Sequence, residues 1–345
     1  MTSNQALKKT FQLHDFPLDS GEKLASGWLS YLQIGELNAA GDNLILLPTY
    51  YGGTHEGILP WIGADSPLNP AQYCLVIPNL IGNGVSVSPS NAEHFQAGPH
   101  FPAISLYDNV RAQKRLLESC FDDAAPALVM GWSMGGMQAL HWGALYPDRV
   151  QRLLSICATA RCWPHNQIFL AGVKAALTCD AAWQDGGYQS PPDKGLKAFG
   201  RVYAGWAYSQ AFFRKQLHRE LGLETLQDVL DYWEEDHLQQ DANNLLCVLE
   251  SWQQADISQL PAFAGDPEQA LASIRAPSII MPSSTDLYFT AEDAAWEAAR
   301  MPHAELRVLE SDWGHIAGAP GRSPVDHQQI MTACADLLTR RGLAS

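Results

Sequence analysis

Short apolar runs alternate with amphipathic segments of helical period along much of this chain. Three of the runs have the length and composition of buried strands. They are residues 43–48 (NLILLP), 72–79 (QYCLVIPN) and 152–159 (RLLSICAT). Between the second and the third run, residues 104–120 place Leu106, Val110 and Leu117 on one face of a helix. This alternation of strands and helices predicts an α/β protein with a doubly wound, largely parallel sheet.

The strand pattern stops between residues 160 and 272, where the chain becomes helical and rich in Trp, Tyr and Gln. We expect residues 160–272 to form a helical cap that is inserted into an α/β core of residues 1–159 and 273–345. Such a cap would cover a functional site on the core and exclude water from it. Aromatic residues at helical spacing in this cap favour internal packing over a ligand cage. They are Phe199, Tyr203, Trp206, Phe212 and Phe213. The charged stretch LDYWEEDH (230–237) is interpreted as a solvated helix face.

The most informative motif is GWSMGG at residues 131–136, which ends an apolar run and precedes a helix rich in Gly and Ala. In a G-x-S-x-G turn between a strand and a helix, the serine sits on a sharp, strained bend above the sheet. Gly131 and Gly135 leave no Cβ to collide with the neighbouring strand and helix. Ser133 is therefore the predicted nucleophile. The alternative is a serine that only caps the N-terminus of a helix.

The partners of such a serine follow along the chain in the order acid, then histidine. Residues 278–290 (SIIMPSSTDLYFT) begin as a buried strand and carry Asp286 past its end, where open α/β sheets place functional groups. We therefore take Asp286 as the acid. The alternatives are that Asp286 only forms a turn, or that Asp293 or Asp312 is the acid.

Among the eleven histidines, His315 follows a strand near the C-terminus, the run ELRVLES at 305–311. We take His315 as the base and interpret His141, behind the nucleophile, and His303, before a strand, as structural or solvated. A serine hydroxyl is a weak nucleophile, so a histidine must remove its proton during the attack. The acid fixes the tautomer of the imidazole and stabilises the imidazolium.

A tetrahedral intermediate needs two backbone N–H donors for its oxyanion. Met134, directly after the nucleophile, is expected to supply one of them. The loop TYYGGTHEG (49–57) follows the first predicted strand, and its Gly pair lets the backbone approach a substrate closely. Tyr50 is the expected second donor, with Tyr51 next. A glycine-rich surface turn is the alternative interpretation of this loop.

Composition narrows the classes of function for these 345 residues. A formal net charge of −15 repels nucleic acid and anionic membranes, so neither is an expected partner. No apolar stretch approaches the roughly 18 residues of a membrane span. The N-terminus MTSNQALKKT lacks the apolar region of a signal peptide, which predicts a cytoplasmic location. The seven cysteines, among them Cys74 and Cys157 in apolar runs, are interpreted as reduced and buried.

These motifs together resemble the homoserine O-acetyltransferase group of α/β-hydrolases. The likeness runs from TYYGGTHEG through LIGNGVSVSPSN and GWSMGGMQALHW to HNQIFLAGVKAAL, TDLYF and GHIAG, and SMGGMQAL is its most specific part. The resemblance implies an α/β-hydrolase fold, double displacement through an acyl-serine, and Ser133, Asp286 and His315 as the catalytic triad. It also implies a homodimer joined through cap helices, with no metal and no organic cofactor.

Two positions depart from the pattern of that group. Its members carry an arginine in the first cap helix that holds the carboxylate of the amino acid, and the matching residue here is Lys174, which lacks the bidentate fork. They also have an aspartate directly after the catalytic histidine, suited to the ammonium of the substrate, and this chain has Ile316. A zwitterionic acceptor would lose its main anchors, so a neutral acceptor fits better.

The sequence therefore favours a serine esterase that hydrolyses short- to medium-chain acyl esters through an acyl-Ser133 intermediate. The alternative is an O-acyltransferase that moves an acetyl group from acetyl-CoA to a small alcohol such as homoserine. A ligand receptor on a hydrolase fold is a third hypothesis, against which the complete triad argues. We expect a small-molecule ester as partner and no cofactor. The residues expected to bind it are Tyr51, Trp132, Lys174, Tyr203, Trp206 and Ile316.

Overall fold

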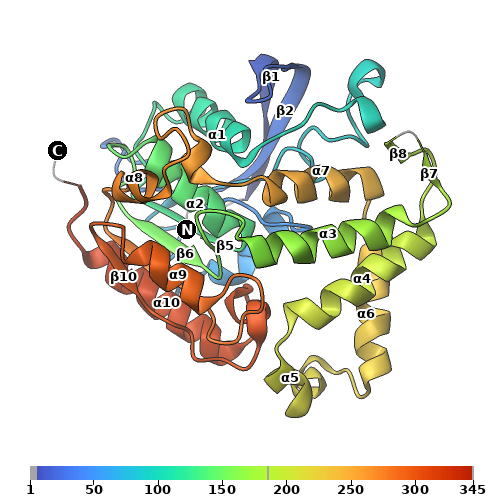
Figure 1. Ribbon diagram of the computed structural model, residues 1–345. Coiled ribbons are helices and arrows are strands. Elements are labelled where there is room, and N and C mark those ends of the chain that lie inside the picture. The colour runs from blue at the N-terminus through green and yellow to red at the C-terminus, as the bar shows by residue number, and fades with distance from the viewer. Residues whose placement is uncertain (1–5, 185, 344–345) are drawn as a thin grey trace.

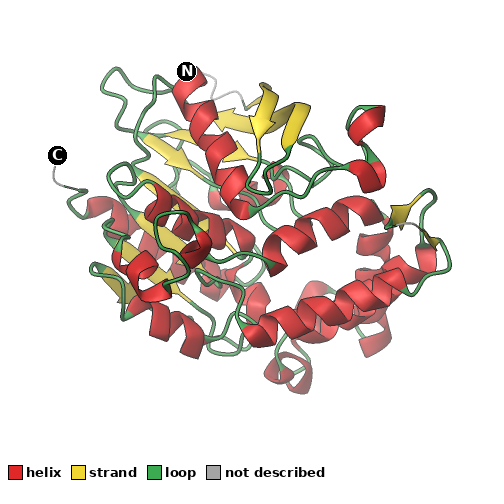
Figure 2. Cartoon of the chain, turned by 45° about the horizontal axis from the view of Figure 1, so that its top comes forward, coloured by secondary structure: helices red, strands yellow, loops and turns green. Residues whose placement is uncertain are grey.

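The computed structural model describes residues 6–184 and 186–343, and a central sheet runs through them (Figure 1, Figure 2). Within these residues the sheet has eight strands in the order β1-β2-β4-β3-β5-β6-β9-β10. The strands are β1 (Leu7–Pro17), β2 (Lys23–Ile34), β3 (Leu44–Leu46), β4 (Cys74–Pro78), β5 (Leu128–Trp132), β6 (Leu153–Ile156), β9 (Ser278–Met281) and β10 (Ala304–Leu306). Neighbours from β4 to β10 are parallel, which confirms the mostly parallel sheet.

The antiparallel edge formed by β1 and β2 is the part of the sheet that the hydrophobic pattern did not predict. Side chains of β2 are buried on both faces. Leu29 and Tyr31 join the core on one side, and Leu32 and Ile34 join the core on the other. A strand that is buried on both faces shows no clean alternation of apolar and polar residues, so the periodicity did not reveal it.

Each predicted run is longer than the strand it forms in the structure, and the difference is largest for the runs 278–290 and 305–311. The run 278–290 gives only β9, because the chain then turns and the N–H of Asp286 donates to the carbonyl of Ser283 at 3.2 Å. The run 305–311 contributes only to β10, and an isolated bridge continues the pairing beyond that strand. The turn leaves Asp286 at the carboxyl edge of the sheet.

Helices cover both faces of the sheet, as in a doubly wound α/β protein. They are α1 (Leu106–Cys120), α2 (Met134–Leu145), α8 (Pro267–Ala272), α9 (Ala291–Ala298) and α10 (Pro324–Thr339). Side chains of α1, α2, α8 and α9 enter one core cluster, and those of α10 enter the cluster on the opposite face. A capping box begins α1, where Ser105 and Asp108 each accept a hydrogen bond from the other's backbone N–H at 3.0 Å.

Between β6 and α8 the chain is mainly helical, and in Figure 1 these helices lie together on one side of the sheet. They are α3 (Pro164–Thr178), α4 (Asp193–Ala207), α5 (Gln210–Arg214), α6 (Leu226–Leu238) and α7 (Ala242–Gln253), with the short strands β7 (Trp183–Gln184) and β8 (Gly187–Tyr188). The chain enters and leaves this region through a paired neck. The N–H of Cys162 donates to Ala255 O at 2.7 Å, and that of Ile257 donates to Ala160 O at 3.1 Å. Since α8 packs in the core cluster, the last part of the expected cap 160–272 lies against the sheet.

Short 3₁₀ turns connect the larger elements. They are η1 (His55–Trp61), η2 (His94–Gln96), η3 (Gly98–His100), η4 (Leu217–Leu221), η5 (Ile257–Gln259) and η6 (Gly314–Gly318). In the part of the chain that the structure describes, no helix is both long enough and apolar enough to cross a membrane.

All seven cysteines carry free thiols, and most are buried. Cys120 and Cys179 are exposed, so the prediction of buried cysteines is wrong for these two. Each stands where a helix ends, at the last residue of α1 and directly after α3.

Candidate active site

Ser133 lies on the sharp turn between β5 and α2. Its backbone has φ 56° and ψ −130°, and such a conformation costs a residue other than glycine on the order of 1–3 kcal/mol. A Cβ on Gly131 would overlap the backbone of Gly135, and a Cβ on Gly135 would lie 2.5 Å from the carbonyl oxygen of Pro48. The two glycines therefore permit the close packing that enforces the turn and holds the serine hydroxyl at the carboxyl edge of the sheet.

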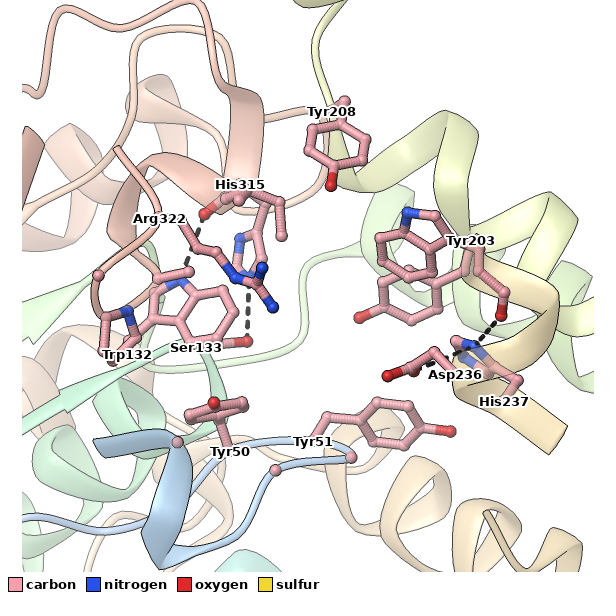
Figure 3. A pocket seen from close by; sticks show the side chains of 18 of the residues that line it. Tyr50, Tyr51, Trp132, Ser133, Tyr203, Tyr208, Asp236, His237, His315 and Arg322 are labelled. Atoms are coloured by element: carbon pink, nitrogen blue, oxygen red, sulfur yellow. Dashed lines mark hydrogen bonds and ion pairs between the residues drawn. The ribbon is translucent and has the colours of Figure 1, made fainter. Parts of the chain in front are cut away.

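The side chains of Ser133, His315 and Asp286 form one chain of hydrogen bonds. Nε2 of His315 lies 2.9 Å from Oγ of Ser133 (Figure 3), and Nδ1 lies 2.6 Å from Oδ2 of Asp286. All three residues are buried. Because an ionised carboxylate only accepts hydrogen bonds, Nδ1 carries the proton and Nε2 is left to accept the serine hydroxyl. This arrangement can remove a proton from Ser133 during attack on a carbonyl.

Backbone groups hold the acid and the histidine loop in position. Oδ1 of Asp286 accepts hydrogen bonds from the N–H groups of Tyr288 (3.1 Å) and Phe289 (3.0 Å). Gly314, directly before the histidine, has φ 64°, and a Cβ there would lie 2.7 Å from the backbone nitrogen of Ser209. Only glycine allows this loop to pass so close to the cap backbone.

The two expected oxyanion donors stand at the start of α2 and in the loop after β3. Among the described residues, neither the N–H of Met134 nor that of Tyr50 has a hydrogen-bond acceptor, so both are available to a ligand. The ring of Tyr50 packs edge-on against Trp132, with 4.4 Å between centroids. A Cβ on Gly53 would overlap the same ring, and a Cβ on Gly57 would overlap its hydroxyl oxygen. The glycines of this loop thus fix Tyr50 beside the nucleophile turn.

A cavity of about 450 Å³ opens over Ser133 and His315, a volume typical of small-molecule sites. Residues of both the core and the cap line it, and Figure 3 shows Tyr203 and His237 facing the catalytic pair across the opening. Four of the residues expected to bind substrate line the cavity. They are Tyr51, Trp132, Tyr203 and Ile316.

Lys174 and Trp206, also expected at the substrate site, are not among the residues that line the cavity. Nζ of Lys174 lies 2.6 Å from Oε1 of Glu250, in an ion pair that joins α3 to α7. The ring of Trp206 packs against Phe169 (4.9 Å between centroids) and His165 (5.2 Å). Contacts with other residues of the cap engage both side chains, through a partly exposed ion pair for Lys174 and ring packing for Trp206, and the sequence could not indicate these contacts.

Part of α6 lines the cavity, so the interpretation of the whole stretch 230–237 as a solvated face is wrong. The cavity residues of this stretch are Tyr232, Trp233, Asp236 and His237. Their spacing puts them on one helix face, and this period was the signal in the sequence that could have found them. Tyr208 and Arg322, which lie outside regular elements, also line the cavity, and no local pattern marks them.

The groups around the catalytic pair are mostly neutral. Burial raises the pKa of Tyr50 to about 12 and also raises the pKa of Tyr203, so both phenols stay protonated. Burial lowers the pKa of His237. The charges of Arg322 and Asp236 shift the pKa of Tyr50 in opposite senses. Within residues 6–184 and 186–343, no group of three or more His, Cys, Asp or Glu could hold a metal ion.

Comparison with known proteins places this site in a family. A family model described as "alpha/beta hydrolase fold" matches residues 42–319. The ethyl acetate hydrolase of Pseudomonas veronii is 36% identical over 327 residues, which cover 94% of this chain and 93% of that protein. The crystal structure of an acetylester hydrolase from Corynebacterium glutamicum has a TM-score of 0.93 at 34% identity and covers 97% of this chain and 96% of that one. The homoserine O-acetyltransferase of Chlorobium chlorochromatii is 28% identical and covers 88% of each chain.

The chain therefore belongs to the α/β-hydrolase family, which confirms the fold predicted from its sequence. It is a hydrolytic enzyme. The esterase relative, at 36% identity, is more similar to it than the homoserine O-acetyltransferase relative at 28%. The resemblance drawn from the motifs is confirmed, and so is the preference for an esterase within that group.

Proposed function

We propose that this protein is a serine esterase that hydrolyses short- to medium-chain acyl esters through an acyl-enzyme on Ser133. The observation that carries the proposal is the hydrogen-bonded chain from Ser133 through His315 to Asp286 beneath a largely aromatic cavity. Acyl transfer to a serine requires this set of groups. The relatives named as ethyl acetate hydrolase and acetylester hydrolase support acetyl esters as substrates.

The reaction begins when Nε2 of His315 takes the hydroxyl proton of Ser133 while Oγ attacks the ester carbonyl. The N–H groups of Met134 and Tyr50 stabilise the oxyanion, and Asp286 stabilises the imidazolium. The imidazolium gives its proton to the departing alcohol, which leaves the acyl-serine. His315 then takes a proton from water, the resulting hydroxide attacks the acyl group, and the proton returns to Oγ as the acid departs.

Two features support water over an amino-acid alcohol as the acceptor. Lys174, at the position of the carboxylate-binding arginine of the homoserine O-acetyltransferase group, is paired with Glu250. Ile316, at the position of the ammonium-binding aspartate, presents an apolar side chain to the cavity. A zwitterion would therefore not find the two partners that the homoserine O-acetyltransferase group has at these positions.

The alternative function is O-acyl transfer from acetyl-CoA to a small alcohol such as homoserine, which the similarity to a homoserine O-acetyltransferase favours. Time courses of acid release from p-nitrophenyl acetate and from acetyl-CoA, each with and without L-homoserine, separate the two functions. We expect acetate as the product and no acceleration by homoserine. Rapid formation of O-acetylhomoserine from acetyl-CoA would contradict the esterase and establish the transferase.

We also propose a homodimer joined through the cap helices. Apolar side chains stand exposed on two cap helices, with Ile168 of α3 70% exposed and Val202 of α4 38% exposed. Such side chains are suited to an interface. Light scattering should give the mass of a dimer for the wild type and of a monomer for Ile168→Glu. The control is Val325→Glu on α10 of the core, where the side chain is also 70% exposed and the dimer should persist.

A cytoplasmic location completes the proposal, and the free thiols of all seven cysteines support a reducing compartment. Cell fractionation with an esterase assay on each fraction tests it. Activity confined to a secreted or membrane fraction would contradict this location.

A further inference from the structure

His237 stands on the cap wall of the cavity, across the opening from Ser133 (Figure 3). It belongs to the last turn of α6 and is only 5% exposed. Its ring packs against those of Phe199 (5.2 Å between centroids) and Trp233 (5.6 Å). This enclosure holds the imidazole in one orientation at the cavity surface.

One hydrogen bond fixes the tautomer of this ring. Nδ1 lies 2.9 Å from the carbonyl oxygen of Trp233. A carbonyl only accepts hydrogen bonds, so Nδ1 carries the hydrogen and Nε2 of the neutral ring is an acceptor. Among the described residues Nε2 has no hydrogen-bond partner. It is not fully buried by protein atoms, and His237 lines the cavity. His237 therefore offers the cavity one fixed acceptor.

The surroundings of His237 favour a neutral donor as its partner. Burial lowers the pKa of His237, and the carboxylate of Asp236, 3.5 Å from Nδ1, raises it less strongly. Asp236 is half exposed and screened by water, and Arg322 on the same cavity carries the opposite charge. The residues of α4 that face the ring, Phe199 and Tyr203, are uncharged.

We propose that His237 is a specificity-determining residue whose Nε2 accepts a hydrogen bond from a hydroxyl group of the substrate. The inference rests on the esterase function proposed above and adds to it a preference for hydroxylated esters, with the hydroxyl in the alcohol or in the acyl part. A plain alkyl ester has only acceptor oxygens, so it would displace water from Nε2 and supply no donor. A site built to bond a substrate hydroxyl discriminates against the analogue without it.

Pairs of esters that differ by one hydroxyl give the first test, on the wild-type enzyme. The pair 2-hydroxyethyl acetate and ethyl acetate probes the alcohol part, and the pair ethyl 3-hydroxybutyrate and ethyl butyrate probes the acyl part. We expect kcat/KM to be about threefold to tenfold higher for the hydroxylated member of at least one pair, the change that corresponds to one neutral hydrogen bond. Equal or lower values in both pairs would overturn the inference.

Variants then assign the preference to Nε2. His237→Phe keeps a packed ring without the acceptor, and His237→Gln supplies an acceptor again. The matched control is His218→Phe, because His218 is another buried cap histidine whose Nδ1 bonds a backbone carbonyl, that of Leu223, but it does not line the cavity. We expect the hydroxyl preference to disappear in His237→Phe, mainly through KM, to return in His237→Gln and to persist in His218→Phe.

The contrary outcomes are equally specific. A preference that survives in folded His237→Phe would overturn the inference, as would an equal loss in His218→Phe, which would trace it to cap packing. Wild-type hydrolysis of alkyl and hydroxylated esters at equal rates removes the role of His237 and leaves the esterase standing. Hydrolysis of none of the four esters removes the esterase and this inference with it. Thermal unfolding checks each variant, and if His237→Phe does not fold, the wild-type ratios and His237→Gln decide.

Discussion

The two walls of the cavity are built in different ways. The core wall depends on backbone geometry: Ser133 is held at φ 56°, and Gly131 and Gly135 stand where a Cβ would strike neighbouring backbone. The cap wall depends on side-chain packing, as in the stack of Tyr203 of α4 on Trp233 of α6 at 5.3 Å between centroids. The proposed catalytic groups thus lie on the wall where little can change, and the proposed specificity-determining residue lies on the wall where one ring can replace another.

The largest loss of activity should come from Asp286→Asn in the core wall. This variant keeps the shape of the side chain but replaces the carboxylate that accepts the hydrogen bond of His315 with an amide. An amide no longer fixes the imidazole tautomer, and we expect kcat to fall by about 10⁴, the loss known for a serine-protease triad. Steady-state kinetics with p-nitrophenyl acetate measure it. Asp293→Asn and Asp312→Asn are the controls, and both should keep most activity. Near-full activity in folded Asp286→Asn would move the acid to another residue.

A pair of glycine variants contrasts the packing of the core with that of the cap. Gly131→Ala puts a methyl group into the backbone of Gly135. Overpacking of this kind should cost on the order of 3 kcal/mol of unfolding free energy and displace the turn that carries Ser133. Gly205→Ala in cap helix α4 meets no heavy atom within 4 Å and should gain roughly 0.5–1 kcal/mol through helix propensity. Urea unfolding measures both. Equal stability of the two variants would contradict the rigid core wall.

The preference for acyl chain length should change when Tyr203, which lines the cavity, is replaced, and should not change when Trp206 is replaced. Tyr203→Leu enlarges the cavity, and apolar pockets discriminate by about 1–3 kcal/mol per methylene, so octanoyl esters should gain about tenfold over acetyl esters. Trp206 packs among cap helices, and Trp206→Leu should leave the profile unchanged. Relative kcat/KM for acetyl, butyryl and octanoyl esters tests this. A larger shift in Trp206→Leu would mean that the cavity wall is assigned wrongly.

The last prediction concerns the pH dependence of stability and Glu297, a core residue that holds the start of the cap. Its carboxyl group accepts hydrogen bonds from the N–H of Ala160 (2.7 Å) and from Nε1 of Trp163 (2.8 Å). Burial raises its pKa from 4.5 to about 8. The folded state therefore binds this proton more tightly than the unfolded state, and the contribution, complete below pH 4.5, declines as pH rises towards 8.

Calorimetry across that range should show Tm falling with rising pH, and the slope should flatten in Glu297→Gln. The control is Glu292→Gln, on the exposed side of the same helix α9, which should keep the wild-type slope. Identical slopes in all three proteins would show that Glu297 does not couple the neck to pH.

The candidate site on the core side could largely be predicted from the sequence, because its signals are local. The G-x-S-x-G turn, Asp286 past a strand end and His315 in a late loop each follow from neighbouring residues. Strand β2 was not predicted, because its burial on both faces removes the alternating pattern, and β1 was not predicted, because most of its side chains are exposed. The cap side was predicted only in part. The partners of Lys174 and His237 lie on other helices or one turn away, and only folding brings them into contact.

The acyl-enzyme on Ser133 is the central claim, and mass spectrometry of protein quenched during turnover of p-nitrophenyl acetate tests it most directly. The account predicts one acetyl group on the peptide that contains Ser133, and no adduct, no turnover and no fluorophosphonate labelling in Ser133→Ala. An acetyl group on another residue, or stoichiometric labelling of folded Ser133→Ala, would contradict it.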